Sequence, residues 1–306
     1  MEKINTSYEV ILTYSPIIEI TGHIFECFDY YLFLRQYFKT GILFFDSLPV
    51  EHLKTMFESK YIFNWAEIEQ DIFFINRKDK TKNTIVSFGK NTVVLLTDGN
   101  LESLEYNKIF LSTTKLLGFL CEDKTYSNIS INKKIIYLQD YRIYGLNKNF
   151  KSYNYVKKIP FQFYKPIKPL NKNIGLMYVT FVCRKITREI IEQYHKLSGC
   201  DKTLLVVPYK IKEYDNIPNI EQVVAPLDNF FEQFDTYIYT PVKRQFDCSP
   251  RLVSECIYYG KNVYLNLDYE DLGLETRYND AITDINKIIL KNDDDILKYI
   301  SKLRYD

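Results

Sequence analysis

The sequence predicts an α/β protein built on parallel sheets, and three observations predict it. Short apolar, β-rich runs alternate with helical stretches in the first third of the chain and again after residue 175. Hydrophobic residues make up 46% and aromatic residues 16% of the 306 residues, enough to fill a sizeable core. A Lys-, Asn- and Pro-rich stretch at 145–175 separates the two alternating regions. We therefore expect two domains, 1–160 and 161–306.

The first region opens with strand, helix, strand, helix. Residues 8–14 (YEVILTY) and 41–46 (GILFFD) predict buried strands, and 24–38 predicts a helix. A second helix is expected at 48–59, where Pro49 suits the start. This alternation is typical of a parallel sheet covered on both faces. Further strands are predicted at 71–76, 84–89, 92–99, 108–113 and 134–140.

The second region has a more regular rhythm. Residues 176–183 predict a strand, followed by a helix at 187–199 with Thr187 as N-cap and Gly199 near its end. Further strands are expected at 203–209, 222–226, 235–241 and 262–265, and helices at 227–234, at 250–259 and, as two closing helices, in 276–306. We expect a Rossmann-like half here and a second one in the first region. Neither GxGxxG nor GxxxxGK[ST] occurs in the chain, so the ligand is expected to be something other than a dinucleotide or a P-loop nucleotide.

Charge and cysteine content narrow the functional classes. The net charge of +1, from 40 basic and 39 acidic residues, gives no global attraction to nucleic acid, although a local basic patch remains open. The six cysteines show neither a CxxC pair nor zinc-ligand spacing, which predicts reduced thiols in a cytoplasm. The N-terminus lacks a signal-peptide pattern, and no apolar run reaches the ~18 residues of a membrane span, so no membrane partner is expected.

Residues 246–265 (FDCSPRLVSECIYYGKNVYL) carry the most specific signal. Ser249 suits an N-cap and Pro250 the first turn of a helix that follows a predicted parallel strand. Ligands of open α/β sheets bind outside the carboxyl ends of the strands, and a helix N-terminus favours phosphate. Arg251 adds a guanidinium fork for phosphate, and Glu255 can accept hydrogen bonds from ribose hydroxyls. The alternative is a surface ion pair at i,i+4 spacing.

This stretch resembles the nucleotide-sugar site of GT-B glycosyltransferases, in which a helix offers its N-terminus to a diphosphate and a Glu to the ribose. Residues 21–34 (TGHIFECFDYYLFL) similarly resemble the first βα loop of that family, where the acceptor and catalytic groups meet. The resemblance implies two Rossmann-like domains facing across a cleft, with the acceptor on the N-terminal side and the donor on the C-terminal side. The acidic repeat of many members, two Glu about seven apart, is incomplete, since Asp247 lies eight residues before Glu255.

Further donor-side candidates lie after other predicted strands. Arg184 and Lys185 can neutralise charge on a departing diphosphate, with a solvated basic pair as the alternative. The loop at Pro226 can hold a nucleobase through backbone groups, with a plain turn as the alternative. No DxD motif stands at a strand end, and the acidic run at 293–295 is expected to cap a C-terminal helix, so we expect no metal and no cofactor beyond the donor, a UDP-sugar being favoured.

On the acceptor side, Gly22 allows close approach of a substrate. The base that takes a proton from the acceptor hydroxyl is His23, Glu26, Asp29 or Asp98, and the sequence does not choose among them. For His23 the alternative is a capping or packing role. Both the retaining and the inverting outcome stay open.

The predicted function is transfer of a sugar from a nucleotide-diphosphate sugar to a hydroxyl group of a saccharide, a small molecule or double-stranded DNA. The compact length and AT-rich residue usage are similar to bacteriophage glycosyltransferases that modify hydroxymethylated pyrimidines, which implies the host cytoplasm. The alternatives are a non-catalytic nucleotide or nucleotide-sugar binding protein and a nucleotide-sugar epimerase. Residues 153–172 mix Lys with Tyr and Phe, which suits nucleic acid or a linker with packed aromatics.

Overall fold

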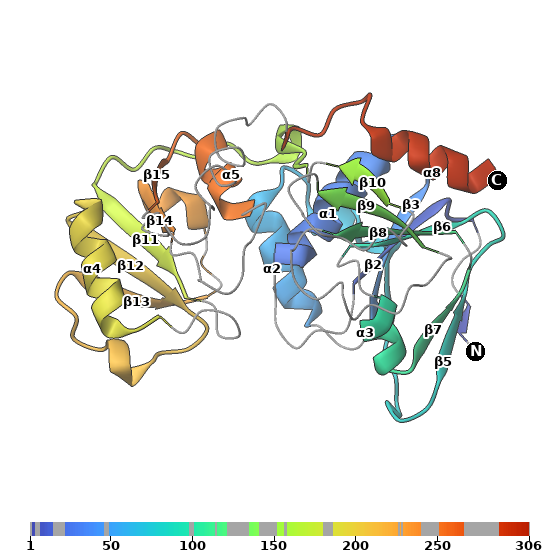
Figure 1. The fold of residues 1–306 in the computed structure, drawn as a ribbon, viewed down its shortest axis with the longest axis horizontal. Coiled ribbons are helices and arrows are strands. Elements are labelled where there is room, and N and C mark those ends of the chain that lie inside the picture. Colours follow the sequence, from blue (N-terminus) through green and yellow to red (C-terminus); the bar gives the residue numbers. More distant parts are fainter. Residues whose placement is uncertain are drawn as a thin grey trace. The chain divides into compact units, whose positions relative to one another are not determined.

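The chain folds into two compact units, each built on parallel β-structure (Figure 1). The first unit is Met1–Tyr164 with Lys287–Asp306, and the second is Lys165–Asn286. The computed structural model describes residues 2–3, 7–14, 22–45, 49–97, 101–113, 115–120, 135–140, 152–155, 158–179, 186–225, 227, 229–239, 251–265 and 288–305. Within these ranges, no helix has the length and apolarity that a membrane span requires.

The larger sheet of the first unit has seven described strands, all paired in parallel, in the order β10-β9-β8-β6-β2-β3-β4. They are β2 (Val10–Tyr14), β3 (Thr40–Phe45), β4 (Ile72–Ile75), β6 (Val93–Leu96), β8 (Leu116–Leu120), β9 (Ile135–Asp140) and β10 (Ser152–Tyr155). Numbered 1 to 7 in chain order and read from β4 to β10, the strands have the order 3-2-1-4-5-6-7. The first six positions follow the order of the Rossmann fold, so the expected α/β class with parallel sheets is confirmed.

The core of this unit follows from uninterrupted apolar runs. Every residue of β2 and β3 is buried, as expected for parallel strands covered on both faces. Helix α1 (Gly22–Leu34) contacts both strands, and from Ile24 to Leu34 each side chain except Phe25 is buried. A helix that is apolar on all sides belongs in a core, which explains this position. Helix α2 (Val50–Lys60) begins after Pro49, as predicted.

A second, smaller sheet in the first unit joins β1 (Glu2–Lys3), β5 (Thr84–Ser87) and β7 (Ile109–Ser112) in the order β1-β5-β7. Helix α3 (Leu101–Tyr106) leads directly into β7. Thr84 pairs with Ile109 and Ile85 with Phe110 across β5 and β7. The sequence predicted the strands β5 and β7 but not that they leave the main sheet to form their own.

The C-terminal helix α8 (Asp295–Tyr305) packs on the first unit, whereas the sequence placed it in the C-terminal domain. The Lys115 ammonium donates to the carbonyl oxygen of Arg304 at 2.7 Å, and the Arg304 guanidinium pairs with the Glu9 carboxylate. The acidic run opens this helix as expected, since Asp294 Oδ1 accepts a hydrogen bond from the Ile296 N–H at 3.2 Å.

The second unit has a sheet of five described strands, again all parallel, in the order β13-β12-β11-β14-β15. They are β11 (Ile174–Tyr178), β12 (Lys202–Val207), β13 (Ile220–Val224), β14 (Thr236–Tyr239) and β15 (Asn262–Leu265). In chain order this is 3-2-1-4-5, again the Rossmann order. Helices α4 (Arg188–Ser198) and α5 (Arg251–Tyr258) follow β11 and β14 (Figure 1).

Local signals at α4 agree with the sequence. The Thr187 side chain accepts a hydrogen bond from the Ile190 N–H, and Gly199 ends the helix at φ +68°. The expected helix at 227–234 is instead a single 3-10 turn at Phe230–Glu232, because Asn229 in the left-handed region (φ +48°) breaks the helical path.

Asp235 fixes the entry of β11 in this sheet. Its carboxylate accepts hydrogen bonds from the N–H groups of Asn171 at 2.7 Å, Lys172 at 2.9 Å and Ile174 at 3.2 Å. Burial alone would raise the pKa of Asp235, but these N–H groups and the Lys261 charge lower it below its ordinary value. The clamp therefore depends on Asp235 being ionised.

Candidate nucleotide site in the second unit

The strand order of the second sheet defines a switch point between β11 and β14, where the direction of winding reverses. Ligands of such sheets bind outside the carboxyl ends of the strands at this point. Helix α4 follows β11 in the chain, and helix α5 follows β14. The topology therefore brings the starts of these two helices to the edge where a ligand is expected.

Helix α5 begins with a buried ion pair. The Arg251 Nε lies 2.6 Å from the Glu255 Oε1, and the two side chains are only 9% and 3% exposed. Val253 and Cys256 on the same helix belong to the core that covers one face of the sheet. The i,i+4 pair that the spacing allows does form, but it is buried rather than on the surface.

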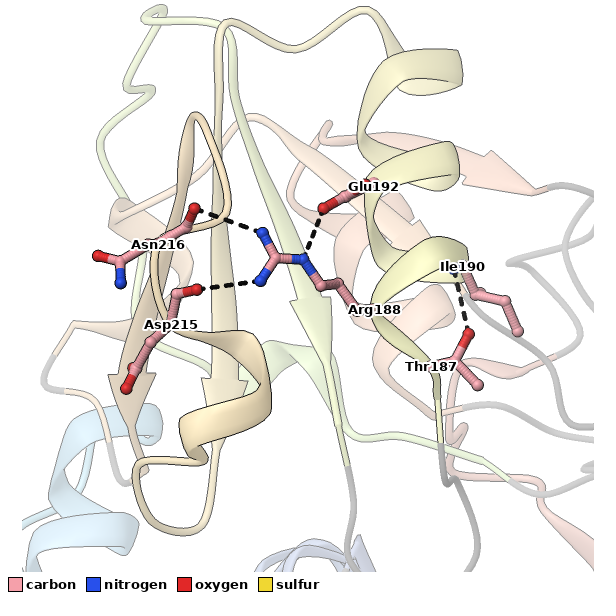
Figure 2. A network of polar contacts seen from close by, with 6 residues as sticks. All are labelled: Thr187, Arg188, Ile190, Glu192, Asp215 and Asn216. Atoms are coloured by element: carbon pink, nitrogen blue, oxygen red, sulfur yellow. Dashed lines mark hydrogen bonds and ion pairs between the residues drawn. The ribbon is translucent and has the colours of Figure 1, made fainter.

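Helix α4 also carries an Arg–Glu pair four residues apart, but this pair is exposed to solvent; Figure 2 shows its contacts. The Arg188 Nε pairs with the Glu192 Oε1 at 2.8 Å, but these side chains are 38% and 46% exposed. The Arg188 guanidinium also donates to the backbone carbonyls of Asp215 at 3.3 Å and Asn216 at 3.4 Å. This network fastens the first turn of α4 to the loop before β13. The two Arg–Glu pairs thus stand at equivalent places in the topology but in different environments.

Burial gives the α5 pair its significance. Removing two charges from water costs free energy that apolar side chains of similar volume would not cost. A buried charged pair in the first turn of a helix at a ligand-binding edge is therefore a functional-site candidate.

Tyr259, just after α5, is affected by the same buried carboxylate. Burial first, and then the charges of Glu255 and Tyr258, raise the pKa of Tyr259 far above its ordinary value. Tyr259 stays protonated and donates to the Lys165 carbonyl oxygen at 2.9 Å.

The remaining donor-side candidates lie outside the described residues. They are Arg184, Lys185, Pro226, Asp247 and Ser249. In the sequence, Arg184 and Lys185 come between β11 and α4, and Asp247 and Ser249 between β14 and α5. Their roles stay predictions.

The acceptor-side candidates follow the switch point of the first sheet, which lies between β2 and β6. Gly22 and His23 form the first turn of α1, the helix after β2. Asp98 comes after β6 in the sequence and lies outside the described residues. For His23 the structure describes the backbone but not the side chain.

Glu26 and Asp29, the other two candidate bases, are 1% and 0% exposed. The Asp29 Oδ1 accepts hydrogen bonds from the hydroxyls of Tyr61 at 2.7 Å and Tyr164 at 3.2 Å. A base must come within hydrogen-bond distance of the proton that it takes. In this conformation the Asp29 carboxylate has no exposed surface and already accepts two tyrosine hydroxyls, so it lies in the core of the first unit.

These carboxylates belong to a polar cluster in the core of the first unit. Burial first, and then the charges of Glu26 and Asp294, raise the pKa of Tyr30. The Lys158 ammonium pairs with the buried Asp294 carboxylate. The cluster joins three residues of α1 to Lys158 and Asp294, which come from two distant parts of the chain, so local sequence gives no signal for it.

The Lys- and aromatic-rich stretch before the second unit contributes to the same core. Phe161 and Tyr164 are 3% and 4% exposed, and Lys158 is paired with Asp294. Buried rings cannot stack on bases, so the interpretation as packed aromatics holds for these residues.

Within the part of the chain that the structure describes, no group of three or more His, Cys, Asp or Glu side chains could hold a metal ion. Comparison of the chain with protein-family models and with curated proteins finds no match in either.

Proposed function

We propose that this protein transfers a sugar from a nucleotide-diphosphate sugar, a UDP-sugar being favoured, to a hydroxyl acceptor. One observation carries the proposal. The buried Arg251–Glu255 pair opens α5, the helix that follows the switch-point strand β14 of a sheet in Rossmann order.

The chemistry of this helix start suits a diphosphate. The N–H groups of the first turn and the helix dipole favour negative charge, and the Arg251 guanidinium adds a planar fork of donors that fits phosphate oxygens. Glu255 holds Arg251 in place and is the carboxylate that we assign to the ribose hydroxyls. In the proposed reaction the N–H groups of the first turn and the Arg251 guanidinium stabilise the negative charge that develops on the diphosphate as the sugar leaves.

The acceptor is assigned to the first unit, at the carboxyl edge of β2 and β6. His23 and Asp98 follow these strands and are the preferred bases, because the side chains of Glu26 and Asp29 are 1% and 0% exposed. The proposal includes the GT-B arrangement of two Rossmann-like domains facing across a cleft. Its acceptor is a saccharide, a small molecule or double-stranded DNA, with a hydroxymethylated base of phage DNA as the specific case.

The test is a thermal-shift panel of UDP-, GDP-, ADP- and CMP-sugars, followed by an assay for nucleotide release with and without acceptor. A donor at a hundredfold excess over its Kd stabilises the folded state by about 2.7 kcal/mol, which raises Tm by several degrees. Arg251→Lys, which keeps the charge but loses the fork, is expected to weaken this shift. Arg188→Lys is the matched control, because it alters the equivalent exposed pair on α4.

Each outcome separates the candidate functions. A shift with release of nucleotide and a glycosylated acceptor supports the transferase. A shift without turnover identifies a nucleotide-binding protein, and conversion of one nucleotide sugar into another identifies an epimerase. If no donor shifts Tm, or if Arg251→Lys and Arg188→Lys respond alike, the site assignment is wrong.

A further inference from the structure

The small sheet of the first unit presents apolar side chains to solvent. Ile85 on β5 and Phe110 on β7 lie directly opposite each other and are 44% and 37% exposed. Tyr106, the last residue of α3, is 87% exposed and lies three residues before the start of β7. Ile85 and Phe110 thus form one exposed apolar pair, and exposed apolar side chains that lie together mark an interaction site more often than isolated ones do.

A lysine-rich loop meets this surface at the start of β5. Lys78, Lys80 and Lys82 in the loop before β5 are exposed. The Arg77 guanidinium donates to the Asn107 carbonyl oxygen, and the Thr84 N–H donates to the Lys108 carbonyl oxygen at 2.8 Å. These contacts hold the loop beside the turn that follows α3, so the loop and the end of α3 lie at the same end of the small sheet.

The charge of this region differs from that of the whole chain. Residues 77–84 and 105–110, at the start of β5 and before β7, hold five cations and two carboxylates, a net charge of +3 (5 − 2), against +1 for all 306 residues. The cations are Arg77, Lys78, Lys80, Lys82 and Lys108, and the carboxylates are Asp79 and Glu105. The balanced composition therefore conceals a local basic patch.

We propose that this surface binds single-stranded nucleic acid. Clustered lysines attract phosphates through counterion release, and an exposed ring offers a face on which an unpaired base can stack. An acidic polypeptide would satisfy the lysines, but it would make no use of the ring of Tyr106. The proposal goes beyond the sugar transfer, because it concerns the small sheet of the first unit and needs no donor.

The first experiment measures fluorescence anisotropy of a labelled 20-nucleotide single strand of mixed sequence, in a series of salt concentrations. Replacing Lys78, Lys80 and Lys82 together by Glu is expected to weaken binding at least tenfold and to reduce the slope of log K against log salt by about 2. The matched control replaces Lys168, Lys172 and Lys210 by Glu, three exposed lysines of the second unit, and is expected to bind as the unaltered protein does.

The second experiment separates stacking from charge. Tyr106→Ala is expected to weaken binding about tenfold, and Tyr106→Phe to keep it, because base stacking needs the ring and not the hydroxyl. A duplex of the same length and charge per strand is expected to bind more weakly than the single strand, since its bases are already stacked.

The proposal fails if the unaltered protein shows no salt-dependent binding, or if the loop variant and its control lose the same affinity. It fails equally if Tyr106→Ala binds as tightly as Tyr106→Phe, or if the duplex binds as tightly as the single strand. Because no nucleotide sugar is present, these results do not depend on whether the donor site of the second unit is correct.

Discussion

Replacing one member of the Arg251–Glu255 pair should destabilise the protein far more than an ordinary helical ion pair would. The two side chains are 9% and 3% exposed, with Nε and Oε1 at 2.6 Å. Glu255→Ala leaves the Arg251 charge buried without its carboxylate, at a cost of about 3–5 kcal/mol. With an m-value of about 2 kcal/mol per molar urea, the unfolding midpoint should fall by about 2 M.

The chain supplies its own control for this measurement. Glu192→Ala breaks the exposed pair with Arg188, which has the same spacing and is worth about 0.2–1 kcal/mol. The double replacement Arg251→Met with Glu255→Leu removes both charges and should be close to neutral in stability, because apolar side chains of similar size fill the site. Urea unfolding followed by tyrosine fluorescence and circular dichroism gives all three values.

The result that refutes the reasoning is a Glu255→Ala midpoint equal to that of Glu192→Ala. The pair would then be hydrated in solution, and the argument from burial to a functional site would lose its basis. A double variant as unstable as Glu255→Ala would instead show that packing, and not an uncompensated charge, causes the loss.

Three further replacements test other parts of the structure. Asp29→Ala leaves the hydroxyls of Tyr61 and Tyr164 without their acceptor and should cost about 1–3 kcal/mol in urea unfolding, with Asp29→Asn costing less. The folded state lowers the pKa of Asp235 from its ordinary value of 3.8. The ionised carboxylate therefore stabilises the folded state fully above pH 3.8, and this stabilisation is lost as the pH falls through the lower pKa of the folded state. Asp235→Asn should accordingly reduce the dependence of the unfolding free energy on pH in this acidic range. Gly175→Ala would place a Cβ 2.8 Å from the Ile238 Cδ1 and should lower stability by about 1–3 kcal/mol, and an unchanged Tm would contradict the packing of β11 on its neighbours.

The sequence predicts those parts of the fold that local patterns determine. The uninterrupted apolar runs of β2 and β3 predict buried parallel strands, and the structure confirms them. Thr187 and Gly199 predict the two ends of α4, because a hydroxyl acceptor and a left-handed C-terminal residue act within one turn of the helix.

Other features depend on contacts between distant residues and leave no local pattern. The strand β10 has the sequence Ser-Tyr-Asn-Tyr, which shows no apolar run, and only its pairing with β9 makes it a strand. Helix α8 is amphipathic, but nothing in its own sequence tells which sheet its apolar face covers.

In the candidate site, too, local patterns predict some features and contacts between distant residues determine the others. The sequence predicts the helix that carries Arg251 and Glu255 and the spacing that pairs them. It cannot predict that this pair is buried while Arg188 and Glu192 remain exposed, because both pairs have identical spacing. Likewise the acidic residues of α1 suggested a base, and only the packing of Tyr61 and Tyr164 assigns Asp29 to the core.

Helix α8 belongs to the first unit but follows the second unit in the sequence, and this fixes the order in which the two units receive their residues during translation. Lys165–Asn286 leave the ribosome as one continuous block, so the second unit has all its residues before the first unit receives α8. Until α8 is made, Lys115 and Glu9 lack Arg304, whose carbonyl oxygen accepts from Lys115 and whose guanidinium pairs with Glu9. All residues of the second unit are therefore synthesised before the first unit is complete, whereas domains generally receive their residues one after the other along the chain.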